Sequence, residues 1–242
     1  MRKITFILLF FINILFSQTI KVEYDLLIDM NGMLSNPLRH KIELVNSQGK
    51  SLVKKFRNNR FETKALNKDG ENLMIVKTSS DTVYFYKEFE ENKLYSEEKI
   101  FTKIFNVKDS LRIFDWDIVN DTVSILGYKC FKAKTKFRGR EFEAFFTTDI
   151  QMADGPAKYN GLPGLILKVS IINSGAVYSI EATKIVLTQE NTKISNPFDE
   201  KKCITFSEFK KKYINKMNEM ESYNANQGIS ISKTGLELLF NE

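Results

Sequence analysis

The backbone of this chain is most constrained between Asp154 and Leu167, where glycine and proline are concentrated. This stretch holds three of the eleven glycines and two of the four prolines in the 242-residue sequence. Proline holds φ at about −65°, and glycine reaches conformations closed to other residues, so this density dictates the backbone path. We expect two tight turns, at Gly155–Pro156 and at Leu162–Leu165, followed by a buried strand.

The second turn has the residue order of a type II β-turn. Pro163 suits its second position, and Gly164 accepts the positive φ of its third position. Gly161, just before the turn, leaves room for a close approach of two backbone segments. Two interpretations stay open: a rigid double-turn corner that sets strand register, or a loop that shapes a recognition surface. The residues of this recognition loop would be Gly155, Pro156, Gly161, Leu162, Pro163, Gly164, Leu165 and Ile166.

Much of the remaining sequence has the period-two pattern of antiparallel strands. Hairpins are predicted where two such segments flank a short polar or glycine-containing turn. The predicted hairpins join Lys41–Val45 to Ser51–Phe56, Asn72–Lys77 to Thr82–Glu88, Gly127–Phe137 to Glu141–Thr148, and Leu165–Ile172 to Val177–Val186. Ile20–Met30 and Lys93–Ile100 are further strands. In Thr82–Phe89, the face shared by Val83, Phe85 and Phe89 also carries Lys87.

One helix is predicted near the C-terminus. Thr205 and Glu208 have the spacing of a capping box, in which each side chain accepts a hydrogen bond from the other residue's backbone N–H. Apolar side chains then recur every three or four residues as one stripe. They are Phe206, Phe209, Tyr213, Met217 and Met220. We therefore predict a mainly β (α+β) fold: a curved antiparallel sheet built from hairpins, with its core closed by a helix over Phe206–Tyr223.

The N-terminus has the features of a secretory signal peptide. Arg2 and Lys3 precede an apolar run from Ile4 to Phe16, and Ser17 is small enough to precede a cleavage site. The run is shorter than the about 20 apolar residues of a membrane-spanning helix. We predict a signal peptide at residues 1–17 and a single domain at residues 18–242, exported without a transmembrane segment in the mature chain.

Residues that could carry chemistry are few. His40 is the only histidine, so no histidine cluster is available for a metal, and we expect no metal and no cofactor. The net charge of +6 is not gathered on one basic segment, so we expect no nucleic acid partner. Asp149 and Asp154 flank the turns and are the carboxylates of interest. Cys130 and Cys203 could form a disulfide in an oxidising compartment or stay as buried thiols.

The string Gly161–Ile166, which reads Gly-Leu-Pro-Gly-Leu-Ile, resembles the signature of the GLPGLI family of exported bacterial proteins. The resemblance extends over Gly127–Leu167, although Phe145 and Phe146 stand where the family commonly has Trp and Tyr. It implies an exported protein of the Gram-negative envelope, in the periplasm, at the outer membrane or outside the cell. It offers no catalytic residues to transfer. A component of outer-membrane transport or another envelope protein is the implied partner.

On these grounds the predicted function is non-enzymatic binding or docking at the cell envelope. Two alternatives stay open. In the first, the curved sheet carries an apolar ligand in a cavity lined by inward-facing aromatic side chains. These side chains would be Phe85, Phe142 and Phe146. In the second, the protein is a hydrolase that uses Asp149, Asp154 or Cys130.

Overall fold

The computed structural model describes residues 19–29, 37–56, 82–111, 114–172 and 177–225. These residues form a twelve-stranded sheet, a short 3-10 helix and an α-helix. The strands are β1 (Thr19–Asp29), β2 (Leu38–Ser47), β3 (Lys50–Phe56), β4 (Thr82–Glu88), β5 (Lys93–Ile100), β6 (Lys103–Ser110), β7 (Asp117–Ile125), β8 (Tyr128–Phe137), β9 (Arg140–Thr147), β10 (Leu165–Ile172), β11 (Val177–Thr188) and β12 (Ile204–Thr205). The helices are η1 (Glu200–Lys202) and α1 (Phe206–Ala225).

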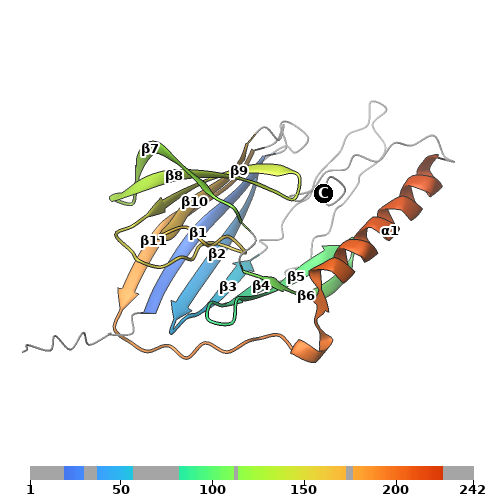
Figure 1. Ribbon diagram of the computed structural model, residues 1–242, viewed down its shortest axis with the longest axis horizontal. Coiled ribbons are helices and arrows are strands. Elements are labelled where there is room, and N and C mark those ends of the chain that lie inside the picture. Colours follow the sequence, from blue (N-terminus) through green and yellow to red (C-terminus); the bar gives the residue numbers. More distant parts are fainter. Residues whose placement is uncertain (1–18, 30–36, 57–81, 112–113, 173–176, 226–242) are drawn as a thin grey trace, which may run out of the picture.

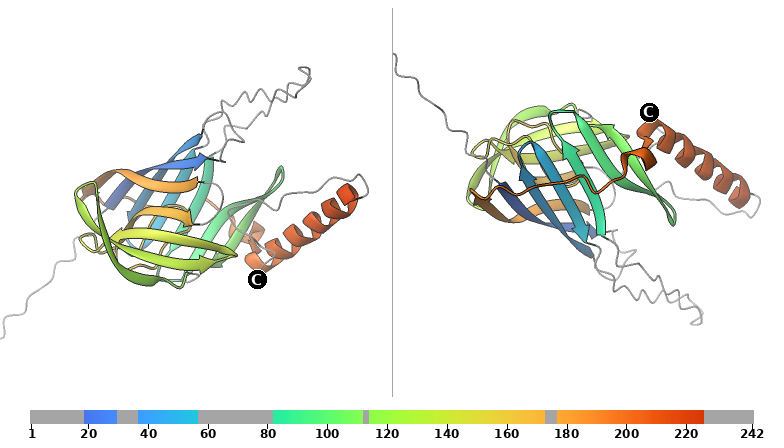
Figure 2. Two further views of the ribbon diagram at one scale, coloured as in Figure 1. Left: turned by 90° about the horizontal axis from the view of Figure 1, so that it is seen from above. Right: turned by 90° about the horizontal axis from the view of Figure 1, so that it is seen from below.

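The sheet is a single curved layer with the strand order β12-β6-β5-β4-β3-β2-β1-β11-β10-β9-β8-β7. The short β12 pairs with β6 in parallel, and the long strands pair in antiparallel ladders. The sheet curls into an open half-barrel, with α1 outside it beside β6 (Figures 1 and 2). The predicted mainly β fold, a curved antiparallel sheet with one C-terminal helix, is confirmed.

Left-handed backbone at two-residue turns builds the hairpins. Gln48 and Gly49, between β2 and β3, have φ of 52° and 70°. Arg138 and Gly139, between β8 and β9, have φ of 46° and 70°. Such turns match the right-handed twist of the flanking strands, so the short glycine-containing turns in the sequence correctly predict both hairpins.

The main core lies between the sheet and the segment that connects β9 to β10. Alternate residues of β1 point into it, among them Tyr24 and Leu26, which are at most 1% exposed. From the connecting segment come Ala157, Tyr159 and Leu162, which belong to the same buried cluster. The concave face of the sheet is therefore filled by the glycine- and proline-rich part of the chain.

Helix α1 begins as predicted but does not close this core. Glu208 N donates to Thr205 Oγ1 at 3.3 Å, and Thr205 N donates to Glu208 Oε2 at 2.8 Å, which completes the capping box. The helix then packs through Phe209 against Phe105 and Val107 of β6, in a small cluster of its own. The prediction that the helix closes the core is wrong, because the β9–β10 segment already occupies the concave face.

Arg138 joins the two ends of the curved sheet. It lies at the tip of the β8–β9 hairpin, and its guanidinium donates to Asp109 Oδ2 of β6 at 2.6 Å. Its Cζ also lies 3.2 Å from the ring centre of Phe206 at the start of α1, and 4.5 Å from that of Phe137. Arg138 is only 6% exposed. These contacts bridge the open half-barrel on the side of α1.

Replacing Arg138 with Ala is expected to lower the free energy of unfolding by about 2 kcal/mol, because a charged hydrogen bond and two ring contacts are lost. Lys136→Ala is the control, because Lys136 pairs with Glu141 on the same hairpin but its side chain is 82% exposed. We expect this control to leave the urea midpoint unchanged. Equal midpoints for the two variants would contradict the bridging role of Arg138.

Several predictions from the sequence concern residues outside the described ranges. They are the signal peptide at residues 1–17 and the strand Asn72–Lys77 with its turn. Among the described residues, no helix is long and apolar enough to cross a membrane.

Candidate functional site

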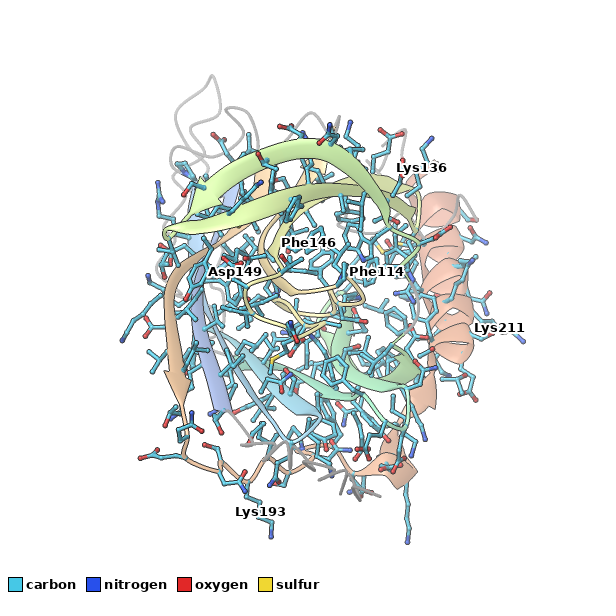
Figure 3. The ribbon with its side chains drawn as sticks, turned by 60° about the vertical axis from the view of Figure 1, so that its left-hand side comes forward. Phe114, Lys136, Phe146, Asp149, Lys193 and Lys211 are labelled. Carbon is cyan, nitrogen blue, oxygen red and sulfur yellow. The ribbon has the colours of Figure 1, made fainter. Side chains whose placement is uncertain are left out.

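The segment between β9 and β10 crosses the concave face of the sheet, surrounded by side chains of the strands (Figure 3). It contains most of the residues considered as a recognition loop. Gly155, Pro156, Leu162 and Gly164 are buried, as are Leu165 and Ile166 at the start of β10. Gly161 and Pro163 are exposed.

The turn at Leu162–Leu165 differs from the predicted type II turn. Gly164 N donates to the carbonyl oxygen of Leu162 at 2.8 Å, which is the hydrogen bond of a γ-turn centred on Pro163. Leu165 N donates across the molecule to the carbonyl oxygen of Ile150 at 3.1 Å. In a type II turn, the N–H of Leu165 would bond to Leu162. Here it joins the start of β10 to the first residues of the connecting segment instead.

The two glycines of the motif have roles opposite to those predicted. Gly161 supplies the positive φ, at +92°. Gly164 supplies the close approach, because a Cβ there would lie 2.0 Å from the carbonyl oxygen of Thr147. Gly155 is also confined, though less tightly, with a Cβ position 2.7 Å from Cβ of Ile166. The backbone of the Gly161–Ile166 motif is thus packed tightly against its neighbours, with Gly164 lying directly against β9.

A buried ion pair fixes the segment to the sheet. Lys87 Nζ of β4 donates to Asp154 Oδ1 at 2.6 Å, to the carbonyl oxygen of Gly155 at 2.7 Å and to that of Tyr159 at 3.2 Å. Asn46 Nδ2 of β2 donates to Asp154 Oδ2 at 2.7 Å, and Gly155 N donates to Oδ1 at 2.8 Å. Neither charged side chain of the pair has any exposed surface.

The electrostatics of this pair suit a structural role. Burial lowers the pKa of Lys87, and the charge of Asp154 acts in the opposite direction. The three N–H groups of the ammonium have three acceptors, which satisfies the requirement for burying a charge. Asp154 therefore has no free oxygen directed at a ligand and cannot serve the hydrolase considered above.

Tyr24 adds a second anchor at the start of β10. Its hydroxyl donates to the carbonyl oxygen of Ile166 at 2.9 Å, and burial, aided by the nearby charge of Asp154, raises its pKa well above the usual value. The β9–β10 register shifts between Ile166 and Lys168, so that the consecutive residues Ile166 and Leu167 are both fully buried. This bulge turns β10 into the core directly after the motif.

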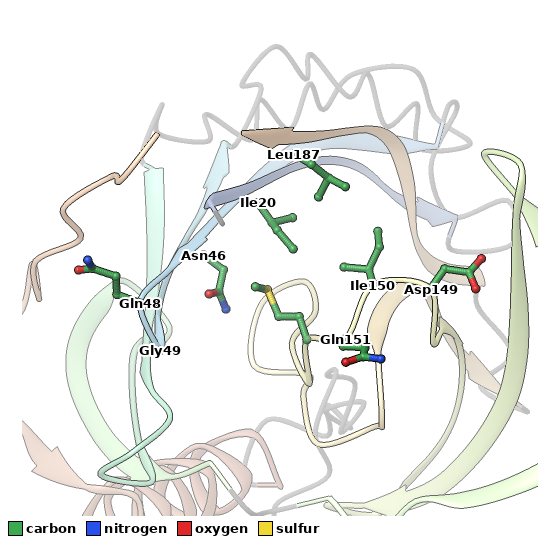
Figure 4. Close-up of a pocket in the computed structure, with 9 residues that line it drawn as sticks. Ile20, Asn46, Gln48, Gly49, Asp149, Ile150, Gln151 and Leu187 are labelled. Carbon is green, nitrogen blue, oxygen red and sulfur yellow. The ribbon is translucent and has the colours of Figure 1, made fainter. Parts of the chain in front are cut away.

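A pocket of about 490 Å³ opens between the first residues of the connecting segment and the ends of β1, β2 and β11 (Figure 4). Its lining residues are Ile20, Asn46, Gln48, Gly49, Asp149, Ile150, Gln151, Met152 and Leu187. Gln48, Asp149 and Gln151 are exposed, so their amide and carboxylate groups are open to solvent. Ile20 and Leu187 form an apolar wall on the β1 and β11 side (Figure 4).

The chemistry of this lining suits a ligand rich in hydroxyl groups. Glutamine amides both donate and accept hydrogen bonds, and a carboxylate accepts two or more. An apolar wall beside a few polar groups is a common composition of a small-molecule pocket. Asn46 connects the pocket wall to the buried ion pair, since its amide binds Asp154. The sequence analysis identified Asp149 but missed Asn46, Gln48 and Gln151, because these residues do not belong to any recognisable sequence motif.

Cys130 and Cys203 are both free thiols, so the disulfide considered from the sequence is not formed. Cys130 on β8 belongs to the main core, whereas Cys203 follows η1 and packs with a separate aromatic cluster. Burial raises the pKa of Cys130 to about 11. Its thiol is therefore protonated at neutral pH and lacks the thiolate that a nucleophile requires.

The aromatic side chains that would line a carrier's cavity are packed instead. Phe85, Phe142 and Phe146 are 6%, 1% and 2% exposed. The Phe142 ring lies 5.6 Å from that of Tyr159, and the Phe146 ring lies 6.0 Å from that of Phe131. The space that an apolar guest would need is occupied by the connecting segment.

Comparison with known proteins finds a matching family and similar solved structures. Residues 57–208 match the family described as N-glycanase peptide, N-terminal domain. Two crystal forms of PNGF-II are similar to this chain. The C2 form has 20% identity over 74% of this chain and 28% of that chain, with a TM-score of 0.47. The P21 form has 22% identity over 74% and 29%, with a TM-score of 0.46.

A LolA superfamily protein, NE2245 from Nitrosomonas europaea, has 7% identity over 69% of this chain and 84% of that chain, with a TM-score of 0.28. No curated protein matches this sequence. This chain spans less than a third of the PNGF-II chains it resembles.

The family match overturns the function predicted from the sequence. It covers more than half of the chain and includes the glycine- and proline-rich segment. The chain therefore belongs to the family of N-glycanase N-terminal domains, and the predicted function of a non-enzymatic envelope docking protein is wrong. The apolar carrier is contradicted by the packed aromatic side chains, and Asp154 and Cys130 do not fit the roles that the hydrolase alternative gave them. Neither the structure nor the family match tests the resemblance to the GLPGLI family or the predicted export signal, so both stay predictions.

Proposed function

Because this chain belongs to the family of N-glycanase N-terminal domains, we propose that it takes part in removing N-glycans from glycoproteins. Its role is to hold the glycosylated substrate, with the sugar at the pocket of Asp149. The family match over residues 57–208 carries this proposal. We further propose that the chain meets its substrate after export, as the signal-type N-terminus and the resemblance to the GLPGLI family indicate.

The lining of the pocket supports a carbohydrate as the bound group. Gln48, Asp149 and Gln151 offer donors and acceptors for sugar hydroxyls. Ile20 and Leu187 offer an apolar surface for the C–H face of a sugar ring. The volume of about 490 Å³ is within the range of ligand pockets and leaves room for a short oligosaccharide branch.

Binding to an N-glycosylated protein, compared with the same protein stripped of its N-glycans, tests this proposal. We expect saturable binding of the glycosylated form only. The double variant Asp149→Ala/Gln151→Ala should bind it about tenfold more weakly, because two hydrogen-bonding groups are lost. Asp117→Ala is the matched control, since Asp117 is an exposed carboxylate on the distant edge strand β7. Equal binding of the two forms of the glycoprotein would refute the proposed function.

A further inference from the structure

The β5–β6 hairpin and α1 project from the half-barrel side by side (Figures 1 and 2). They are held together by Phe209 of the helix, whose ring lies 5.9 Å from that of Phe105 on β6. At the hairpin tip, Phe101 is 54% exposed and Ile104 is 46% exposed. The most distant part of this projection therefore presents two large apolar side chains to solvent.

Phe101 also has a strained backbone conformation, which Leu126 at the β7–β8 turn shares. The φ of Phe101 is 54°, in the left-handed region where hairpin turns prefer glycine, asparagine or aspartate. A bulky aromatic residue is strained in this conformation, and its exposed ring gains little from packing within the chain. Strained residues of this kind are concentrated at sites that bind other molecules.

The space between the hairpin and the helix is basic. A pocket of about 390 Å³ is lined there by Ile100, Phe101, Thr102, Lys103, Phe105, Lys212 and Lys216. The three lysines are exposed, and these described lining residues include no carboxylate. Lys216 also reaches Glu219 on the helix at 2.9 Å, a surface pair that salt and competing anions weaken readily. The apolar tip is thus flanked by positive charge.

We propose that the β5–β6 hairpin tip and the lysines of α1 bind the surface of an anionic lipid membrane. Phe101 and Ile104 enter the boundary between headgroups and acyl chains, while Lys103, Lys212 and Lys216 meet the phosphates. Stable attachment of a peripheral protein requires this combination of apolar insertion and basic charge. The inference is independent of the proposed glycan site, which includes the β2–β3 turn and lies toward the Lys93 end of β5, away from the hairpin tip.

Vesicle flotation with the chain from Gln18 to Glu242, which retains all described residues, tests the proposal. We expect flotation with vesicles of equal parts phosphatidylglycerol and phosphatidylcholine, and none with phosphatidylcholine alone. Added salt should weaken the binding, because the lysine contacts are exposed. Absence of flotation with the anionic vesicles would overturn the proposal.

Variants separate the apolar and the basic contributions. Phe101→Asn should weaken binding to anionic vesicles about tenfold, with an unchanged or higher Tm, because asparagine tolerates the left-handed conformation. Lys212→Gln/Lys216→Gln should remove the preference for phosphatidylglycerol. A purely structural role of Phe101 would lower the Tm instead.

Leu126 provides a closely matched control. It is 47% exposed and has a φ of 52° at the tip of the β7–β8 hairpin, far from α1. Leu126→Asn should leave vesicle binding unchanged. The proposal fails if Phe101→Asn and Leu126→Asn bind alike, or if the chain binds an acidic protein but no anionic vesicle.

Discussion

Replacing Lys87 with Met is expected to lower the free energy of unfolding by about 3–5 kcal/mol, because it leaves the buried carboxylate of Asp154 without its countercharge. The replacement keeps the length and apolar stem of the side chain, so the loss is chiefly electrostatic. Two carbonyl oxygens, of Gly155 and Tyr159, also lose their donor. Urea denaturation monitored by circular dichroism measures the change.

Lys168→Met is the control for this effect. Lys168 pairs with Glu181 at 2.8 Å, but the two side chains are 32% and 48% exposed. Surface pairs of this kind contribute at most about 1 kcal/mol, so its urea midpoint should change little. The double variant Lys87→Met/Asp154→Asn should lose less stability than the sum of the two single variants, because the charges are coupled. Additive losses would show that the pair does not fix the connecting segment.

The hairpins are the part of the fold that the sequence predicts best, because their signals are local. The polar turn around Gly49 and the turn at Gly139 identify β2–β3 and β8–β9 without knowledge of distant contacts. Helix α1 is predicted by its capping box and apolar stripe for the same reason. Strands β6 and β7 are missed, because most of their side chains remain partly or fully exposed and their alternation is weak.

Contacts between distant residues explain most of what the sequence does not reveal. Lys87 stands out on an otherwise apolar strand face, but its partner Asp154 is 67 residues away. The γ-turn at Pro163 depends on Ile150, which takes the N–H that a type II turn would use. The candidate pocket is harder still, since Gln48 and Gln151 line the same pocket only when the connecting segment folds back onto the concave face of the sheet.

The position of the connecting segment relates these structural findings to the proposed function. Its buried half is fixed by Lys87, and the start of β10 that follows it is fixed by Tyr24. Its exposed first residues, Asp149 and Gln151, line the pocket. A rigid support of this kind holds polar groups in place before a ligand arrives, which lowers the entropic cost of binding. We therefore expect the motif to act on glycan binding indirectly, by positioning the pocket.

The strongest test of this packing is Gly164→Ala, which is expected to lower the free energy of unfolding by at least about 4 kcal/mol. The added Cβ would lie 2.0 Å from the carbonyl oxygen and 2.7 Å from the carbonyl carbon of Thr147. Both are backbone atoms of β9, so no side chain rotation can relieve the overlap. To fit the methyl group, β9 and β10 must separate, which disrupts the hydrogen bonds that join them.

Gly127→Ala separates this overlap from backbone strain. Gly127 has a φ of +83°, but no atom lies within 4 Å of its Cβ position, so alanine there should cost only about 1–2 kcal/mol. Gly155→Ala, whose Cβ would be 2.7 Å from Cβ of Ile166, should fall between the two. Urea denaturation ranks the stability of the variants. If Gly164→Ala cannot be recovered as a folded protein while Gly127→Ala is soluble, the two variants are ranked in the expected order. If Gly164→Ala were as stable as Gly127→Ala, the motif would be a flexible loop, and the fixed support proposed for the pocket would be lost.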